Sequence, residues 1–155
     1  MTTTTTTITT TDAQAEILAI LAEHAAAHAE RDVDALLALY AAEPVLYTLA
    51  PPLQQTPDAE YGSPAGLRAW FATFDGPVQI HYRDPVVSAA GDLAFVHTLT
   101  SMTATPAGAP QSFTFWFRST FGLQRAKGHW LIAHRHESTP FHMDGSFRAA
   151  TDLQP

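Results

Sequence analysis

A change in hydrophobic period near residue 78 constrains the fold of this chain most strongly. Before that point apolar residues recur at three- and four-residue steps, as on one face of a helix, and beyond it they alternate with a period of two, as on a strand. Four strands are predicted, over residues 78–88, 92–104, 111–125 and 129–137. Short turn sequences (AAGD, PAGAP and AKGH) connect them. Short connections between long strands indicate an antiparallel meander.

The first half of the chain predicts three helices and one short strand. The first helix begins at the capping box of Thr11–Gln14, and the second begins near Asp32 and ends before Pro44. Ser63 and Pro64 begin the third, because a hydroxyl cap followed by proline favours a helix start. A strand is predicted over residues 45–49. Helices followed by strands predict an α+β fold, with the helices packed on one face of a curved sheet.

The chain length of 155 residues suits one domain. Residues 1–11 form a Thr-rich N-terminal arm, residues 12–143 the α+β domain and residues 144–155 a C-terminal tail in this interpretation. The arm has neither the basic segment nor the apolar segment of a signal peptide.

The composition excludes several classes of partner and site. The formal net charge is −7, with 8 Lys and Arg against 15 Asp and Glu, so nucleic acid is not an expected partner. The absence of cysteine removes disulfides, thiolate zinc sites and cysteine nucleophiles. No apolar run approaches the roughly 20 residues of a membrane span. A cytoplasmic protein without a membrane partner is expected.

Three segments of the chain resemble a known family. They are DVDALLALYAAEPVLYTLAPPL, DGPVQIHYRDPVVSAAGDLAFVHTLT and WFRSTFGLQRAKGHWLIAHRHESTPFHM, and the most specific pattern is W-x-I-x-H-x-H-x-S-x-P-F. Over residues 13–154 the chain resembles the SnoaL-like proteins of the nuclear-transport-factor-two-like, or ketosteroid-isomerase-like, superfamily. The resemblance implies a cone of three helices on a strongly bent antiparallel sheet enclosing a deep pocket, in a homodimer. Members include isomerases, dehydratases, epoxide hydrolases, polyketide cyclases and binding proteins.

The chain departs from the ketosteroid isomerases at the positions that carry their chemistry. Thr48 stands where the resemblance places their general-base aspartate, and His24 stands where they have an oxyanion-binding tyrosine. The strand over residues 111–125 contains no acidic residue. Arg135 and His142 stand where SnoaL-like relatives usually carry acidic residues. The isomerase mechanism based on carboxylic acids is therefore not expected.

Three histidines are the main candidates for chemistry. Because side chains alternate along a strand, His134 and His136 are predicted to share an inward face with Trp130 and Ile132. His97 is the polar member of an apolar stripe on its own strand. Such histidines are either hydrogen-bonded core residues or functional groups.

Two functional hypotheses follow from this placement. In the first, His97 and His136 transfer protons, His134 assists, and Tyr47 donates to a developing oxyanion. In the second, His97, His134 and His136 bind a metal, since residues i and i+2 of a strand lie roughly 6.6 Å apart and their rings can converge on one ion. The first is favoured, with no cofactor.

Six further residues are predicted to contact a ligand; core packing is the alternative for Trp70 and Phe74, and dimer packing is the alternative for Arg118. They are His24, Tyr40, Trp70, Phe74, Trp116 and Arg118. The expected function is acid–base dehydration, isomerisation or cyclisation of a small hydrophobic or polyketide-like molecule. The alternative is a binding protein without catalytic activity.

Overall fold

The computed structural model describes residues 10–56 and 63–155, and it confirms the α+β prediction. The first nine residues of the Thr-rich arm and residues 57–62 of the loop after the first strand lie outside the described residues. The elements, in order, are α1 Thr10–Glu30, α2 Val33–Ala38, β1 Tyr40–Tyr47, α3 Pro64–Phe71, β2 Phe74–Ala90, β3 Leu93–Pro106, β4 Phe113–Ala126 and β5 His129–Ser138.

The five strands form one sheet in the order β1-β5-β4-β3-β2. Strands β2 to β5 make the predicted antiparallel meander. Strand β1 pairs with β5 in parallel, so the prediction of a wholly antiparallel sheet is wrong at this edge. Parallel pairing is possible here because β1 and β5 are far apart in the sequence and need no hairpin turn.

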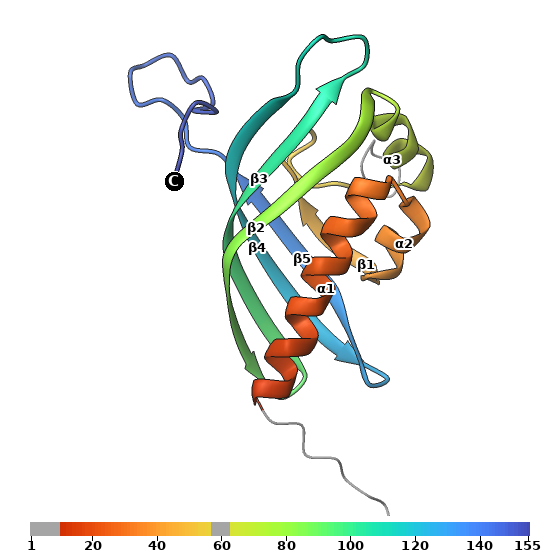
Figure 1. Ribbon diagram of the computed structural model, residues 1–155. Helices are drawn as coiled ribbons and strands as arrows, with labels where there is room; N and C mark the ends of the chain where they lie inside the picture. The colour runs from red at the N-terminus through yellow and green to blue at the C-terminus, as the bar shows by residue number, and fades with distance from the viewer. Residues whose placement is uncertain (1–9, 57–62) are drawn as a thin grey trace, which may run out of the picture.

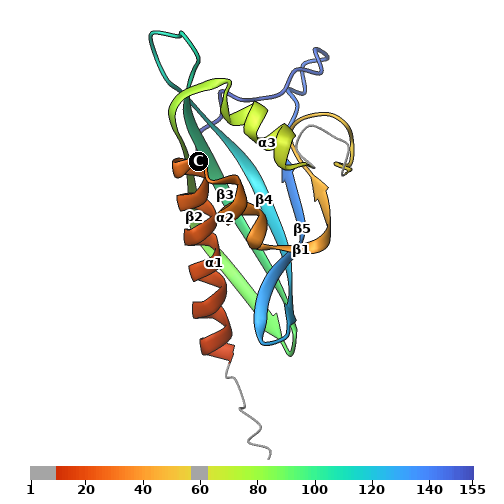
Figure 2. The same cartoon turned by 90° about the vertical axis from the view of Figure 1, so that its right-hand side faces the viewer.

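The three helices lie on one side of the bent sheet (Figure 1). Helix α1 runs along β2, while α2 and α3 cover the end of the sheet near β1 (Figure 2). Asp32 caps α2 through its Oδ1, which accepts from the Ala35 amide at 2.9 Å. Ser63 caps α3 in the same way, accepting from the Gly66 amide at 3.0 Å.

The prediction that the second helix continues past Tyr40 to Pro44 is wrong. Helix α2 ends at Ala38, and Tyr40 begins β1. The Leu39 carbonyl accepts a hydrogen bond from the Ile132 amide at 2.9 Å, so pairing with β5 replaces a further helical turn. Pro44 would also have interrupted a longer helix. This early exit places the Tyr40 side chain beside α1.

A β-bulge in β5 reverses the faces of its second half. Ile132 pairs with Leu123 and His134 pairs with Gly122, so Ala133 is an extra residue without a partner on β4. The alternation restarts after the bulge. Ile132 is buried against the helices, and after the extra residue it is Arg135, not His134, that turns inward.

Beyond β5 the chain folds into a short hook on the side of the sheet away from the helices (Figure 1). A bridge between Phe141 and Ala149 closes the hook, and His142 Nε2 lies 2.9 Å from Asp152 Oδ1. Within the described ranges, no helix combines the length and apolar character needed to cross a membrane.

Candidate functional site

A pocket of about 450 Å³ lies between the helices and the sheet at the end where α2, α3 and β1 meet. Most of its wall is apolar, from Leu36, Leu37, Leu46, Leu67, Trp70, Ile80, Met102, Phe115 and Phe117. Its polar lining residues are His28, Tyr40, Thr48, Arg135 and Glu137. An apolar body with a few convergent polar groups is the usual form of a small-molecule site.

Arg135 and Glu137 face the pocket from β5, two residues apart beyond the bulge. Their side chains are only 12% and 16% exposed, and Arg135 Nε lies 3.5 Å from Glu137 Oε1. Burial opposes the charge of Arg135, but Glu137 and the phenols of Tyr40 and Tyr82 outweigh it and raise the pKa of the guanidinium. The arginine therefore stays charged, and with Glu137 it places opposite charges at one end of the pocket.

Tyr40, His24 and Arg135 form a closed triangle of hydrogen bonds. Arg135 Nη1 donates to Tyr40 Oη at 2.8 Å and also lies 3.2 Å from His24 Nε2, while Tyr40 Oη is 2.8 Å from the same nitrogen. Because a guanidinium only donates, Nε2 must be an acceptor. Neutral His24 then carries its hydrogen on Nδ1 and donates it to Tyr82 Oη at 2.6 Å.

Burial keeps His24, Tyr40 and Tyr82 uncharged. It lowers the pKa of His24 well below its ordinary value, and His28 and Arg135 lower it further. Burial, opposed by Arg135, raises the pKa of Tyr40 to about 12, and it raises that of Tyr82 as well. Tyr40 is thus a neutral phenol at neutral pH. Its hydrogen can turn from His24 to a ligand, because Arg135 keeps His24 Nε2 paired.

His28 lies one turn after His24 on α1 and lines the pocket. Its Nδ1 is 2.8 Å from the His24 carbonyl, which can only accept, so the hydrogen of neutral His28 is on Nδ1. Burial lowers the pKa of His28 to about 4, against the effect of this hydrogen bond. His28 is consequently a neutral imidazole in the wall of the pocket.

The loop after β1 forms the mouth of the pocket. Gln55 is 4% exposed and its Nε2 donates to Thr48 Oγ1 at 2.9 Å and to two loop carbonyls, those of Ala50 and Pro51. Thr48 in turn donates to the Ala50 carbonyl at 3.2 Å. Thr48 is therefore a structural residue of the mouth.

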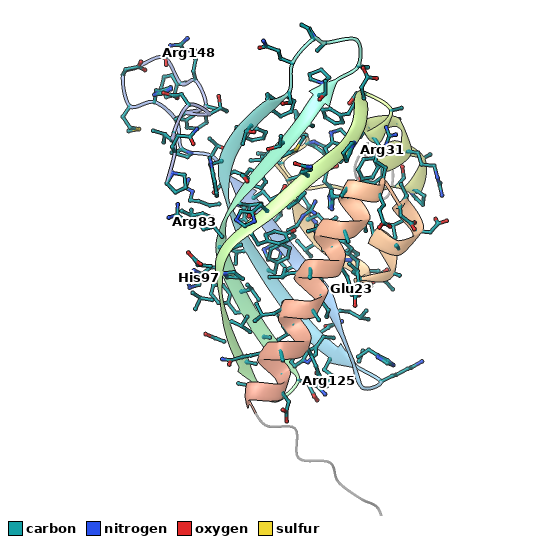
Figure 3. The ribbon with its side chains drawn as sticks, in the orientation of Figure 1. Glu23, Arg31, Arg83, His97, Arg125 and Arg148 are labelled. Atoms are coloured by element: carbon teal, nitrogen blue, oxygen red, sulfur yellow. The ribbon has the colours of Figure 1, made fainter. Side chains whose placement is uncertain are left out.

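The prediction that His97, His134 and His136 face the pocket is wrong. Cross-strand partners share a face, and His97 and His136 both pair with Thr120, on the side of the sheet away from the helices. Figure 3 shows His97 on that outer side. For His134 and His136 the cause is the bulge at Ala133, and for His97 it is an apolar stripe that is itself exposed, including Phe95 at 47%.

Tyr47 also lies on the outer face, where its ring contacts His134 and His136 at centroid distances of 5.2 and 5.6 Å. The predicted donation from Tyr47 to an oxyanion in the pocket is therefore contradicted, since it borders instead an open groove with His136 and Pro52. The alternative prediction, a metal site formed by His97, His134 and His136, is not supported either. No group of three or more His, Cys, Asp or Glu in the described part of the chain is placed to hold a metal ion.

The six predicted ligand contacts divide into three groups. Tyr40 and Trp70 line the pocket, and His24 lies behind Tyr40, buried and outside the lining. Phe74 packs on Trp70 at a ring distance of 5.4 Å without reaching the pocket. Trp116 and Arg118 are wrongly predicted, because they alternate with the inward-facing phenylalanines of β4 and so lie on the outer face.

Arg135, Glu137, Tyr82 and the role of His28 were not predicted from the sequence. One signal pointed to Arg135: the resemblance to the SnoaL-like proteins implies an acidic residue at its position, so this chain departs from them there. Strict alternation along β5 argued the other way, and the bulge decides between the two.

The fold and pocket define an α+β protein with a nuclear-transport-factor-two-like cone, and the comparisons agree. The SnoaL-like domain family matches residues 17–142, so the chain belongs to the SnoaL-like family. No curated protein sequence matches this chain significantly.

Solved structures share the fold over most of their length. An NTF2-like protein of unknown function from Pseudomonas putida KT2440 is 29% identical, with a TM-score of 0.78 over 94% of this chain and 98% of that one. An NTF2-like superfamily protein from Salmonella enterica serovar Typhimurium LT2 is 14% identical, with a TM-score of 0.72 over 89% and 98%. A candidate scytalone dehydratase from Novosphingobium aromaticivorans DSM 12444 is 14% identical, with a TM-score of 0.69 over 90% and 91%.

Proposed function

We propose that the protein binds a small, flat, mainly apolar carbonyl compound and catalyses proton transfer at the carbon next to the carbonyl. One observation carries the proposal: the Glu137 carboxylate, the Arg135 guanidinium and the Tyr40 phenol meet at one end of a pocket whose other walls are apolar. This retains the expected acid–base chemistry and moves it from the histidines to a different set of residues.

Each of these three groups has a role in the proposed reaction. Glu137 is the base that takes the proton as the C–H bond breaks, and the electron pair moves onto the carbonyl oxygen. Arg135 and the Tyr40 hydroxyl donate hydrogen bonds to that oxygen as its charge develops. With a β,γ-unsaturated ketone, Glu137 returns the proton to the γ-carbon, which completes an isomerisation. With a β-hydroxy ketone, Glu137 gives the proton to the β-hydroxyl group, which leaves as water as the enolate restores the carbonyl, and this completes a dehydration.

The charge balance of the site favours a neutral ligand. Arg135 and Glu137 offset one another at 3.5 Å, and His24 and His28 are neutral. An anionic ligand would meet the Glu137 carboxylate, and a cationic one would meet Arg135. The flat rings of Trp70, Phe115 and Phe117 suit a planar apolar body.

Deuterium exchange at the α-carbons of 2-tetralone in D₂O tests this function, because exchange is the enolisation step common to both reactions. The protein should accelerate exchange over buffer, and Glu137→Gln should reduce the acceleration by roughly 100-fold, as expected on losing a general base. His136→Gln is the matched control, one residue away on the outer face, and should leave the rate unchanged. Equal losses in both variants would refute the role of Glu137.

Binding without catalysis is the second candidate function, and it is favoured by the same apolar wall. In that case 2-tetralone would bind with no exchange above the buffer rate. Glu137→Gln would then alter affinity alone.

We also propose that the outer sheet face mediates a homodimer. Val86, Leu93, Phe95 and Leu99 are all more than 40% exposed there, on a face that none of the helices among residues 10–56 and 63–155 covers. Phe95→Lys should halve the mass measured by sedimentation, whereas Leu53→Lys, at a position that is 99% exposed, should not. A monomeric parent protein would contradict the proposal.

A further inference from the structure

Some polar groups at one end of the pocket already form hydrogen bonds within the protein, and others remain available to a ligand. Both available interactions of Arg135 Nη1 are taken, by Tyr40 and His24. Thr48 is used in the mouth loop, where it accepts from Gln55 and donates to Ala50. These groups do not distinguish one ligand from another in the resting protein.

Besides the Glu137 carboxylate, which is the base in the proposed function, two groups remain open. Arg135 Nη2 has no hydrogen-bond partner among residues 10–56 and 63–155. Arg135 Nε also lacks a hydrogen bond and is fully buried, whereas Nη2 is not fully buried. Nη2 thus offers its hydrogens to the pocket that Arg135 lines. They suit a carbonyl oxygen.

His28 Nε2 is the second open group. The hydrogen of His28 is on Nδ1, held by the His24 carbonyl, so Nε2 is a bare acceptor. Nε2 has no hydrogen-bond partner in the described part of the chain, and it is not fully buried. Since His28 lines the pocket, a ligand can reach this nitrogen. The low pKa of about 4 keeps it unprotonated at neutral pH.

We infer that the preferred ligands are hydroxylated cyclic ketones, whose carbonyl oxygen accepts from Arg135 Nη2 and whose hydroxyl group donates to His28 Nε2. The inference rests on the proposed function for the carbonyl group and adds the hydroxyl group to it. A buried acceptor left without a donor discriminates against ligands that lack one, so His28 selects for a ring hydroxyl.

The test measures the affinity of the protein for 2-tetralone, for a panel of its ring-hydroxylated isomers and for the corresponding methyl ethers. At least one hydroxylated isomer should bind ten or more times as tightly as 2-tetralone, and its methyl ether should not. His28→Leu should reduce that advantage to less than twofold. His97→Leu, on the outer face, should leave the advantage at its parental value.

Two results would overturn the inference: no hydroxylated isomer with an advantage in the parent protein, or an advantage that persists in His28→Leu. If that variant does not fold, ¹⁵N NMR of the parent protein decides. The His28 Nε2 resonance should shift with the hydroxylated isomer and not with its methyl ether, and an unshifted resonance refutes the contact.

Failure of the proposed function gives a different result. The hydroxyl advantage would then be present and depend on His28, but no tetralone would exchange deuterium faster than in buffer. Conversely, rapid exchange without any hydroxyl advantage would leave Glu137 as the base and remove only the role of His28.

Discussion

The two halves of the space between α1 and the sheet differ in what α1 places there. Towards the start of α1, Ile17 and Leu21 pack on β4 and β5 in a core of apolar side chains that includes Phe121 and Ile132. One and two turns later the same helix face presents His24 and His28, and the pocket opens. The apolar half stabilises the fold, and the half with histidines gives up close packing for a site.

A layer of polar residues separates the halves. His24 touches Phe121 of the packed half at a ring distance of 6.0 Å and hydrogen-bonds to Tyr40, which lines the pocket. Every fully buried side-chain nitrogen and oxygen of His24, Tyr40, Tyr82 and Arg135 has a hydrogen bond except Arg135 Nε, which is ion-paired with Glu137 at 3.5 Å. The layer therefore closes the packed core to water while it holds Tyr40 and Arg135 in place for a ligand.

The largest expected difference between the halves is in the loss of stability when one phenylalanine of each half is replaced by alanine. Phe121 and Phe115 lie on the same face of β4, but Phe121 is 0% exposed and Phe115 lines the pocket. Phe121→Ala should lower the free energy of unfolding by about 3–5 kcal/mol. Phe115→Ala should cost roughly half as much, because its ring already borders a cavity. Urea titrations measure both, and equal losses would contradict the division into halves.

The next effect is a pH dependence confined to the pocket half. The unfolded chain protonates His28 near 6.5 and the folded one near 4, so the unfolded state binds more protons between these values and stability falls as pH falls. The loss approaches about 3 kcal/mol near pH 4. Urea titrations of the parent protein and His28→Leu should show a shallower dependence in the variant. Parallel curves would mean that His28 titrates normally.

The smallest effect compares two tyrosines of β1. Tyr40 lies inward with hydrogen bonds to His24 and Arg135, while Tyr47 lies outward and its hydroxyl has no hydrogen bond within the described ranges. Tyr40→Phe should lower the free energy of unfolding by about 1–2 kcal/mol, and Tyr47→Phe by about zero. Thermal unfolding of the two variants makes the comparison. A larger loss for Tyr47→Phe would reverse the assigned faces of β1.

The sequence predicted the elements of this fold well and the site poorly, for one physical reason. Hydrophobic period and turn residues depend on local chemistry, and they located the meander and the starts of α2 and α3 to within a few residues. Which face of β5 turns inward depends on Ala133, a residue whose side chain gives no local sign of a bulge. Because of this one extra residue, Arg135 and Glu137 face the pocket, and His134 and His136 lie on the outer face.

The histidines of α1 show the opposite case. His24 and His28 lie four residues apart on α1 and so share one face of the helix, as local spacing requires. No local pattern could bring Tyr82 of β2 or Arg135 of β5 beside His24. Those contacts join residues 58 and 111 positions apart. The polar layer is therefore a property of the tertiary fold.

The central claim is that a ligand enters the pocket lined by Met102 and Arg135 and does not contact the outer histidines. NMR of the protein with ¹³C-labelled methionine methyls, titrated with 2-tetralone, tests it most directly. Met102 lines the pocket, whereas Met143 is 97% exposed in the C-terminal hook and serves as an internal control. The account predicts a saturable shift of the Met102 methyl, with Met143 and the ring signals of His97 and His136 unchanged. Shifts of those two histidines without a shift of Met102 would contradict it.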